Sequence, residues 1–437
     1  MYHSTDISFS IISLGCSKNQ VDAEKLQGGL VSAGFSTAED TESADILIIN
    51  TCGFITPAKE ESISVILDAL AIKENRDVKT SFPRRVAVTG CLSKRYFDDL
   101  AADMPEVDLL YGLLDEEFIP ALAHRFDITL DSAMKHDQVP LIRGLAYRYI
   151  KISEGCSNNC SYCAIPLIRG PLKCFRPEDI LEDVKRAAAD GAREINLISQ
   201  DTSLYQSGDT GLPELMGMVS EVPGVEWIRI LYCHPDHVTP EIIEAIGSID
   251  KVVPYIDLPF QHVSTDILRS MGREGSYDRY RDLVRELRSR VPGICIRSTF
   301  MTGYPGETGR DFKELLAFLS EMKLDRVGAF PFSPEEDTPA ALMDGQVSPS
   351  RAKKRYERLM ALQQKISENR LMAMIGSEVT VLIEEQIDEN TWVGRTEFDA
   401  PEVDGVFYLT GSALRVNSIV TATVTDAVEY DLIGEVS

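Results

Sequence analysis

The chain has 437 residues, 44% of them hydrophobic, which is enough for two or three domains with substantial cores. It contains no run of about 18 apolar residues, which excludes a membrane-spanning helix, and its net charge of −25 opposes nucleic acid over most of its surface. Its first residues lack the basic segment of a signal peptide, so we expect a cytoplasmic protein with reduced thiols. Its nine cysteines then indicate metal ligands or reactive thiols rather than disulfides.

The first part of the chain, residues 6–124, alternates short apolar segments with polar ones. The apolar segments predict strands, at residues 8–14, 45–49 and 85–89. The polar segments between them predict helices, at residues 20–33 and 57–71. This α/β alternation indicates a doubly wound sheet with parallel strands, followed by a linker at 125–141.

Each of these predicted strands ends close to a cysteine that has a glycine beside it: Cys16, Cys52 and Cys91. Because the carboxyl ends of parallel strands meet at one edge of a sheet, we expect the three thiols to converge there. A three-thiolate iron–sulfur site is one interpretation, and three buried structural cysteines are the other. A zinc site would need a fourth protein ligand, and no histidine lies near these turns.

From residue 142 to 372 the alternation continues with longer units. Apolar segments predict six strands, at residues 147–152, 194–198, 227–232, 252–258, 293–299 and 326–331. The segments between them predict helices, at residues 178–189, 213–220, 239–247, 264–271, 277–290 and 309–322. Six consecutive βα units indicate a TIM-like partial barrel, with its active-site loops at the carboxyl ends of the strands.

The loop after the first strand of this predicted barrel carries Cys156, Cys160 and Cys163 in the spacing C-x₃-C-x₂-C. Three thiolates that close together suit one iron–sulfur cluster and leave its fourth iron open to another ligand. Such a site can serve electron transfer, dehydration or radical chemistry. Polar groups follow the other strands too, including Ser199, Gln200 and Asp201 after the second, so the chemistry is expected at this rim.

The last segment, residues 375–437, contains about five short strand-like runs and predicts a small β-barrel of the OB type. From residue 376 onward it has thirteen acidic residues and only two basic ones, Arg395 and Arg415. Barrels of this kind often bind RNA. The negative electrostatic field of this segment, however, opposes a polyanion and suits a basic polypeptide.

The C-x₃-C-x₂-C loop, with an aromatic residue before its last cysteine, resembles the radical SAM superfamily. The resemblance implies that S-adenosylmethionine (SAM) binds the open iron and that its cleavage yields a radical able to remove hydrogen from an unactivated carbon. It implies that Tyr162 lies against the adenine. It also implies that the loop Ser199, Gln200 and Asp201 helps to hold the amino group of SAM.

The segment from Leu14 to Glu24 resembles the opening motif of the methylthiotransferase family, and Cys52, Cys91, the radical SAM loop and a terminal TRAM-type barrel follow in the family's order. The resemblance implies two 4Fe–4S clusters. One, on Cys156, Cys160 and Cys163, generates the radical. The other, on Cys16, Cys52 and Cys91, binds or supplies the sulfur.

Two branches of that family differ in substrate. The segments 18–22, 398–405 and 430–435 are similar to the RimO-type branch, which modifies the β-carbon of an aspartate in ribosomal protein uS12. That resemblance implies a basic protein substrate and an electron donor such as flavodoxin or ferredoxin. The acidic C-terminal segment argues against direct tRNA binding, and the absence of a long apolar run argues against a membrane partner. The alternatives are a MiaB-type tRNA adenosine methylthiotransferase and, in another class, a non-catalytic iron–sulfur electron carrier.

One departure from the family pattern lies near the radical SAM loop. The family has Arg-Gly-x-x-x-Ser-Arg, whereas this chain has Cys174 and Phe175 at the last two positions and Arg176 one place later. This shift puts any role carried over to Arg176 in doubt. Cys174 is interpreted as a substitution at a serine position.

Overall fold

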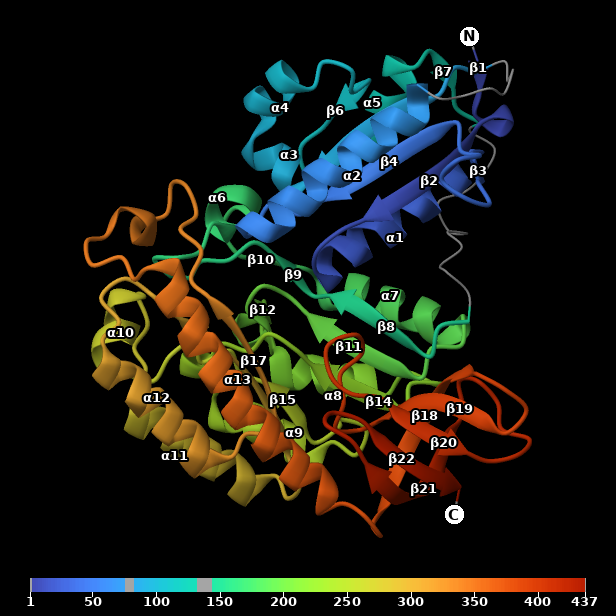
Figure 1. The fold of residues 1–437 in the computed structure, drawn as a ribbon. Coiled ribbons are helices and arrows are strands. Elements are labelled where there is room, and N and C mark those ends of the chain that lie inside the picture. The colour runs from blue at the N-terminus through green and yellow to red at the C-terminus, as the bar shows by residue number, and fades with distance from the viewer. Residues whose placement is uncertain (1, 75–81, 132–143, 437) are drawn as a thin grey trace. The chain divides into compact units, whose positions relative to one another are not determined.

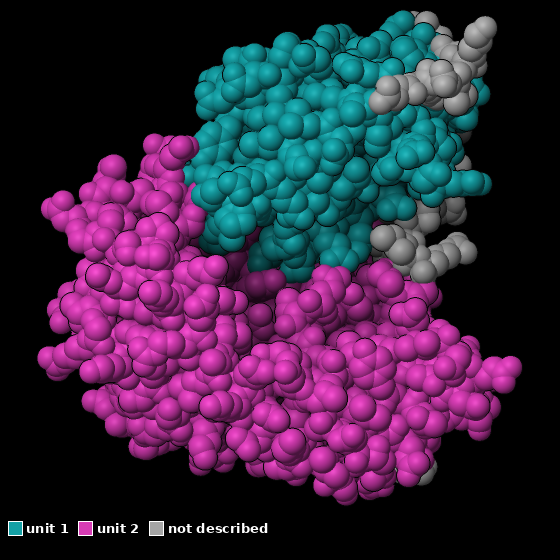
Figure 2. Space-filling model, viewed as in Figure 1, with its two compact units in different colours: residues 1–143, 164–171 teal, residues 144–163, 172–437 magenta. Residues whose placement is uncertain are grey.

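Contacts divide the chain into two units (Figures 1 and 2). The computed structural model describes residues 2–74, 82–131 and 144–436. Unit 1 holds residues 1–143 together with 164–171, and unit 2 holds 144–163 together with 172–437. The short segment 164–171 therefore belongs to the N-terminal unit, although the three cysteines directly before it belong to unit 2.

The core of unit 1 is a five-stranded parallel sheet with the strand order β3-β2-β4-β5-β6. Its strands are β2 (Ser8–Ser13), β3 (Ser36–Thr37), β4 (Ile46–Thr51), β5 (Arg85–Gly90) and β6 (Leu109–Leu110). Its helices are α1 (Ser17–Ser32), α2 (Thr56–Glu74), α3 (Cys91–Arg95), α4 (Phe97–Asp103) and α5 (Phe118–Arg125). The three predicted strands of this region are β2, β4 and β5, and they are neighbours in the sheet.

Both faces of this sheet are buried, which is why its strands are almost continuously apolar. In β4, Ile46 and Ile48 pack with residues of α1 and α5. Leu47 and Ile49 point to the other face and pack with α2, α3 and α4. The doubly wound arrangement predicted from the sequence is therefore confirmed.

The predicted linker at 125–141 is described only in part. Residues 132–141 lie outside the described residues. Before them, β7 (Ile128–Thr129) pairs in parallel with β1 (Tyr2–His3). The first part of the predicted linker is thus a short strand of unit 1 rather than free chain.

Unit 2 contains the predicted partial barrel (Figure 1). Its six parallel strands are β8 (Tyr147–Lys151), β11 (Glu194–Ile198), β14 (Trp227–Ile230), β15 (Tyr255–Asp257), β16 (Cys295–Thr302) and β17 (Arg326–Pro331). They pair as two sheets, β8-β11-β14 and β15-β16-β17, which an isolated bridge between Ile228 and Val252 connects. The surrounding helices are α7 (Pro177–Ala189), α8 (Leu212–Ser220), α9 (Pro240–Ser248), α10 (Thr265–Ser270), α11 (Tyr277–Arg290) and α12 (Gly309–Met322).

The long helix α13 (Pro349–Met372) leads from the partial barrel to a closed five-stranded β-barrel at the C-terminus. The strands of this small barrel are β18 (Glu378–Gln386), β19 (Thr391–Thr396), β20 (Phe407–Thr410), β21 (Ile419–Ala427) and β22 (Leu432–Val436). Its interior is apolar and includes Val381, Phe407 and Leu409. The doubly wound parallel sheet, the TIM-like partial barrel and the small β-barrel expected from the sequence are therefore all present.

The C-terminal barrel is fastened to the amino-terminal ends of the larger barrel's strands. Arg395 reaches Glu194, the first residue of β11, at 2.5 Å, and Glu194 also accepts a hydrogen bond from Arg229 of β14 at 2.7 Å. All three side chains are almost fully buried. Because a buried carboxylate needs cationic partners, Glu194 ties the two barrels together, and the two arginines hold its pKa below the ordinary value against the opposing effect of burial.

The segment 398–405, expected to mark the RimO-type branch, forms the rest of this attachment. Tyr149 donates a hydrogen bond to the carbonyl oxygen of Pro401 at 3.0 Å, and Tyr255 donates one to Asp404 at 2.6 Å. Arg326, the first residue of β17, pairs with Asp399. This segment therefore lies at the end of the partial barrel opposite the loops that follow the strands.

Part of the acidic charge of the C-terminal segment is buried, in this attachment or within the small barrel itself. Five of its thirteen acidic residues are buried or half-buried: Glu384, Glu397, Asp399, Asp404 and Asp431. The other eight are exposed: Glu378, Glu385, Asp388, Glu389, Glu402, Asp426, Glu429 and Glu435. The field expected to attract a basic partner is thus carried by eight residues rather than thirteen. Across the described ranges, helices are all too short or too polar to cross a membrane.

Candidate functional site

The three cysteines of unit 1 lie at the carboxyl ends of three neighbouring strands. Cys16 follows β2 and precedes the first turn of α1, Cys52 follows β4, and Cys91 is the first residue of α3 after β5. Since β2, β4 and β5 are adjacent and parallel, their ends share one edge of the sheet. The structure therefore brings together the thiols that the sequence leaves far apart.

The glycine beside each cysteine is needed for this close packing. A Cβ atom added at Gly15 would lie 2.7 Å from the Sγ of Cys52, and one at Gly90 would lie 2.5 Å from the carbonyl oxygen of Thr51. At Gly53 it would lie 2.7 Å from the backbone of Leu92. Gly15 and Gly90 also have φ angles of 91° and 105°, which side chains disfavour. The three turns pack directly against one another.

The three thiols differ in exposure and in acidity. Cys16 is exposed; desolvation works to raise its pKa, but Lys18, the backbone of Asn19 and Arg169 outweigh it and hold the pKa below the ordinary value. Burial raises the pKa of Cys52 to about 11 and also raises that of Cys91. In both cases neighbouring cysteines of the set add to the increase, so a positive charge is needed to hold all three as thiolates.

An arginine that the sequence did not single out supplies positive charge at this site. Arg169 belongs to α6 (Ile165–Arg169), and its Nε lies 3.3 Å from the Sγ of Cys91. Its other nitrogens donate to Asn19 at 2.6 Å and to Asp22 at 3.2 Å. Spacing within the sequence could not have found this contact, because α6 directly follows the other cysteine loop.

The chemistry of this donor set fits an iron–sulfur cluster better than a single ion. In the described ranges, no three Cys, His, Asp or Glu side chains are placed to share one metal ion. A single zinc ion would require its ligands to meet around one point at bonding distance. A 4Fe–4S cluster instead takes one thiolate at each of several corners, which three neighbouring turns can provide.

The cysteine loop of unit 2 begins at the carboxyl end of β8. It is fixed by β9 (Ser153–Glu154), which pairs with β10 (Lys173–Cys174), and by the left-handed turn at Gly155. Cys156 is buried, and the backbone N–H of Asn158 points at its Sγ at 3.4 Å. Cys160 and Cys163 are half-buried. The loop thus presents three thiols from one short stretch of backbone.

The segment after α10 supports the far side of this loop. Ser161 donates its backbone N–H to the carbonyl oxygen of Met271 at 3.0 Å, and its hydroxyl lies 2.8 Å from that of Tyr304. A Cβ atom at Gly272 would lie 2.7 Å from the carbonyl oxygen of Asn159. The cysteine loop is therefore held by two parts of the barrel rim that lie far along the chain.

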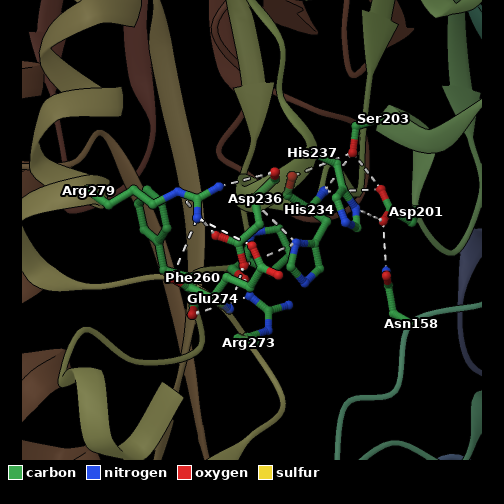
Figure 3. Close-up of polar contacts among 11 residues, drawn as sticks. Asn158, Asp201, Ser203, His234, Asp236, His237, Phe260, Arg273, Glu274 and Arg279 are labelled. Atoms are coloured by element: carbon green, nitrogen blue, oxygen red, sulfur yellow. Dashed lines mark hydrogen bonds and ion pairs between the residues drawn. The ribbon is translucent and has the colours of Figure 1, made fainter. Parts of the chain in front are cut away.

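Asp201 is the centre of a hydrogen-bond network beside the cysteine loop (Figure 3). Its carboxylate accepts hydrogen bonds from Asn158 at 2.7 Å and Ser203 at 2.5 Å, and one oxygen lies 2.7 Å from Nδ1 of His237. Burial works to raise the pKa of Asp201, but these hydrogen bonds hold it below the ordinary value. Through Asn158 this carboxylate fixes the backbone of the cysteine loop.

The other residues predicted to contact SAM lie around the same loop. Gln200 donates to Glu154 at 3.1 Å, and Lys151 pairs with the other oxygen of Glu154 at 2.6 Å. The buried Oε1 of Gln200 has no protein partner within the described residues, so it is able to accept from a ligand. Ser199 is buried and its hydroxyl lies 3.5 Å from that of Thr202, a contact within its own turn. The roles of these residues toward SAM remain predictions.

Tyr162 packs against the apolar core of the partial barrel. Burial raises the pKa of its hydroxyl well above the ordinary value, and the nearby guanidinium of Arg273 only partly opposes that shift. Tyr162 therefore stays neutral and presents a flat apolar face next to Cys160 and Cys163. That environment suits the predicted contact with adenine, which likewise remains a prediction.

The histidines of the rim have local roles. Nδ1 of His234 accepts the backbone N–H of Asp236 at 3.2 Å, and burial lowers the pKa of His234 to about 3, so it is neutral at physiological pH. His262 is fully buried, and its Nδ1 accepts from the backbone of Ser264 at 2.9 Å. Both contacts are to the backbone of a residue two positions further on, so each histidine stabilises its own turn.

Arg176, the arginine displaced from its position in the family pattern, pairs with a nearby residue of α7 rather than with the cysteine loop. Arg176 has 73% of its side chain exposed and pairs at 2.6 Å with Asp179, three residues along α7. Cys174 lies in β10, and its Sγ accepts the backbone N–H of Gln206 at 3.4 Å. A serine hydroxyl can make the same contact, which supports the interpretation of Cys174 as a substitution.

Family models match three parts of the chain. That of the radical SAM superfamily matches residues 150–319, and that of the TRAM domain matches residues 375–436. Residues 8–112 match a model described as uncharacterized protein family UPF0004. The three matches coincide with the partial barrel, the C-terminal barrel and the parallel sheet that carries Cys16, Cys52 and Cys91.

Curated relatives match the chain from end to end. One from Heliobacterium modesticaldum is 40% identical over 437 residues, which cover 97% of this chain and 94% of that protein. One from Clostridioides difficile is 38% identical over 443 residues, which cover 98% of this chain and 99% of that protein. Both carry the name ribosomal protein uS12 methylthiotransferase RimO.

Solved structures share the fold at low sequence identity. The radical S-adenosylmethionine methyltransferase TsrM from Kitasatospora setae aligns with a TM-score of 0.57 at 13% identity, covering 77% of this chain and 75% of that one. The cobalamin-dependent S-adenosylmethionine radical enzyme OxsB aligns with a TM-score of 0.51 at 12% identity, covering 83% and 56%. These likenesses support the architecture alone.

Proposed function

The chain belongs to the RimO family of ribosomal protein uS12 methylthiotransferases, and from this membership we propose that it inserts a methylthio group at the β-carbon of an aspartate of uS12. The structural observation that carries the proposal is the presence of two separate three-thiol sites, one in each unit. One site is needed to generate a radical and the other to bring sulfur. A protein that only carried electrons would need neither the second donor set nor the polar rim around the first.

Cys156, Cys160 and Cys163 would hold the first 4Fe–4S cluster, which would bind SAM. When bound, this pair supplies a carbon radical that removes a hydrogen atom from an unactivated carbon. The residues of the chain position the cluster and SAM. Asn158 and Asp201 fix the cysteine loop, and Tyr162 offers its ring to adenine. Gln200 offers its buried oxygen to a hydrogen-bond donor such as an ammonium group. Ser199 stiffens the turn that carries Gln200 and Asp201.

Cys16, Cys52 and Cys91 hold the second 4Fe–4S cluster, which brings the sulfur. Glycines at the three turns let the backbone approach a bulky inorganic group, and Cys16 is exposed, so its thiol can be reached from solvent. Reducing equivalents come from a donor such as flavodoxin or ferredoxin in the cytoplasm.

The substrate is a basic ribosomal protein rather than tRNA. Family membership and the net charge of −25 support this choice, as do the eight exposed acidic residues of the C-terminal barrel. A polyanion would be repelled by the same surface. The attachment of this barrel through Glu194 and Arg395 leaves those acidic side chains on its outer surface.

The decisive experiment is intact-mass analysis of uS12 after incubation with the reconstituted chain, SAM and a reductant, beside a parallel incubation with tRNA. Replacement of one hydrogen by SCH₃ adds about 46 Da, and we expect that gain on an aspartate of uS12. A gain on tRNA alone would favour the MiaB-type alternative. Reconstituted protein that never consumes SAM would favour the electron carrier.

A further inference from the structure

The guanidinium of Arg169 sits among the thiols of unit 1. Its Nε lies 3.3 Å from the Sγ of Cys91, and only 3% of its side chain is exposed. It holds the side chain of Asn19 at 2.6 Å, and Asn19 in turn donates to the carbonyl oxygens of Leu14 and Thr51. One cation therefore links the turn of Cys91 to the turns that carry the other two cysteines.

The position of this arginine is built by α6 and its packing. Ile168 of α6 and Ala164, the residue directly before the helix, form a small apolar cluster with Cys91. The helix ends at Gly170, whose φ of 74° turns the chain away directly after Arg169. The side chain of Arg169 thus enters the site from a helix whose other residues are anchored beside Cys91, so its location does not depend on a flexible loop.

The charge of Arg169 acts on the whole set of thiols. It lies against the Sγ of Cys91 directly and reaches the turns of Cys16 and Cys52 through Asn19, so all three thiols lie close to its positive charge. An arginine stays protonated at any physiological pH, so this contribution is permanent. Asp22, which pairs with Arg169 at 3.2 Å, carries the opposite charge and acts in the opposite sense.

We propose that Arg169 is a positioning residue of the sulfur-supplying site, whose fixed charge stabilises the more negative state of an iron–sulfur group bound to Cys16, Cys52 and Cys91. The inference rests on the proposed function, because it assumes that this site binds such a group. Its physical basis is that a cation in a buried site favours added negative charge far more than it would in water. Removal of the cation therefore makes reduction harder, and removal of Asp22 makes it easier.

The test uses the full chain with Cys156, Cys160 and Cys163 changed to Ala, so that only the site of unit 1 can bind a cluster. In this parent we compare Arg169→Gln, Arg169→Lys and Asp22→Asn by iron and sulfide content and by the midpoint potential from redox titration. The matched control is Arg176→Gln, an exposed arginine seven positions along the chain that pairs with Asp179.

We expect a more negative potential for Arg169→Gln, a less negative one for Asp22→Asn, a smaller shift for Arg169→Lys and no shift for Arg176→Gln. Opposite signs at Arg169 and Asp22 are what a purely structural role would not produce. Equal potentials for the parent, Arg169→Gln and Asp22→Asn would overturn the inference, as would identical behaviour of Arg169→Lys and Arg169→Gln. If Arg169→Gln takes up no iron, Asp22→Asn and Arg169→Lys alone decide the sign. A parent that binds no iron at all would contradict the proposed function instead.

Discussion

The two cysteine sites of this chain are assembled by different means. In unit 2 the thiols occupy one stretch of eight residues, so the loop itself sets their spacing, and the rest of the barrel only supports it through Asn158, Ser161 and their partners. In unit 1 Cys16, Cys52 and Cys91 come from three strands, and their proximity depends on the order of those strands in the sheet. The first site is a property of a local sequence, and the second is a property of a fold.

This difference predicts how each site fails. A change that disturbs the sheet of unit 1 should empty the second site and leave the first intact. A change in the support of the cysteine loop should weaken the first site without emptying the second. The predictions that follow test this separation, from the largest expected effect to the smallest.

Removal of one cysteine from each site should have the largest effects. Cys156→Ala should abolish formation of deoxyadenosine from SAM, whereas Cys52→Ala should spare it and stop only the transfer of the methylthio group. Each variant should lose about half of the iron, because each cluster holds four irons. Product analysis and iron determination measure both effects.

Cys174→Ser is the matched control for these two variants, since a serine can make the contact that Cys174 makes with Gln206. It should keep full iron and both activities. If Cys52→Ala abolished deoxyadenosine formation in folded protein as completely as Cys156→Ala, the division of labour between the two sites would be wrong.

Gly90→Ala should empty the second site by disturbing the packing of the turns. The new Cβ would lie 2.5 Å from the backbone of Thr51, and the φ of 105° and ψ of −163° belong to a region that is essentially restricted to glycine and costs another residue about 1–3 kcal/mol. We expect loss of the iron bound to unit 1 and a lower midpoint of thermal unfolding.

Gly170→Ala provides the comparison, because Gly170 has a φ of 74° but no atom within 4 Å of the added Cβ. It should lower the free energy of unfolding by about 1–3 kcal/mol, the cost of its backbone conformation alone, and keep its iron. Equal losses in the two variants would mean that strain in the backbone, not contact between the turns, is what Gly90 relieves.

Asp201→Asn should weaken the first site while leaving the second unchanged. The substitution removes the negative charge of the carboxylate to which Asn158, Ser203 and His237 are hydrogen-bonded. Loss of a residue that orients a metal-binding loop in this way costs about 10–100-fold in metal affinity or activity. Electron paramagnetic resonance of the reduced cluster and the rate of deoxyadenosine formation report the effect.

The same variant separates two roles for Asp201. If Asp201 positions the cysteine loop, the resonance spectrum changes even without SAM. If it contacts only SAM, the spectrum without SAM stays the same and the KM for SAM rises. Asp236→Asn, in the same network but without a contact to the loop, should leave both readouts close to those of the original chain.

The smallest effect is a difference in the reactivity of the thiols in iron-free protein. Cys16 is exposed and its pKa is lowered, whereas the pKa of Cys52 is about 11. At pH 8 a thiol with that pKa is ionised about 100-fold less than one with the ordinary value of 9. Iodoacetamide should therefore label Cys16 well before Cys52, and labelling of Cys52 should rise as the pH approaches 11.

Mass spectrometry of the labelled peptides measures this order. Cys233, which is fully buried and has a raised pKa, is the internal reference and should react more slowly than Cys16 throughout. Labelling of Cys52 ahead of Cys16 at pH 8 would show that the environments of the two thiols are not as described.

Much of the architecture can be predicted from the amino-acid sequence. The strand ends near Gly15, Gly53 and Gly90 are recognisable because a glycine and a cysteine stand together after each apolar run, and the barrel helices are recognisable from their spacing. The segment 398–405 is recognisable as a motif, but its structural role cannot be predicted from the sequence. Its side chains fasten the C-terminal barrel to the starts of β8, β15 and β17, a role that depends on contacts between residues far apart in the chain.

The sequence by itself determined the cysteine loop of unit 2 and the alternation of strands and helices, because both are set by spacing along the chain. Only the tertiary structure decided what surrounds the thiols. The contacts of Arg169 with Cys91 and of Asp201 with Asn158 join positions that no local pattern relates. Asp201 meets Asn158 because the parallel strands β11 and β8 end at the same edge of their sheet, where residues distant in sequence become neighbours. Arg169 meets Cys91 because α6 packs beside the turn that follows β5.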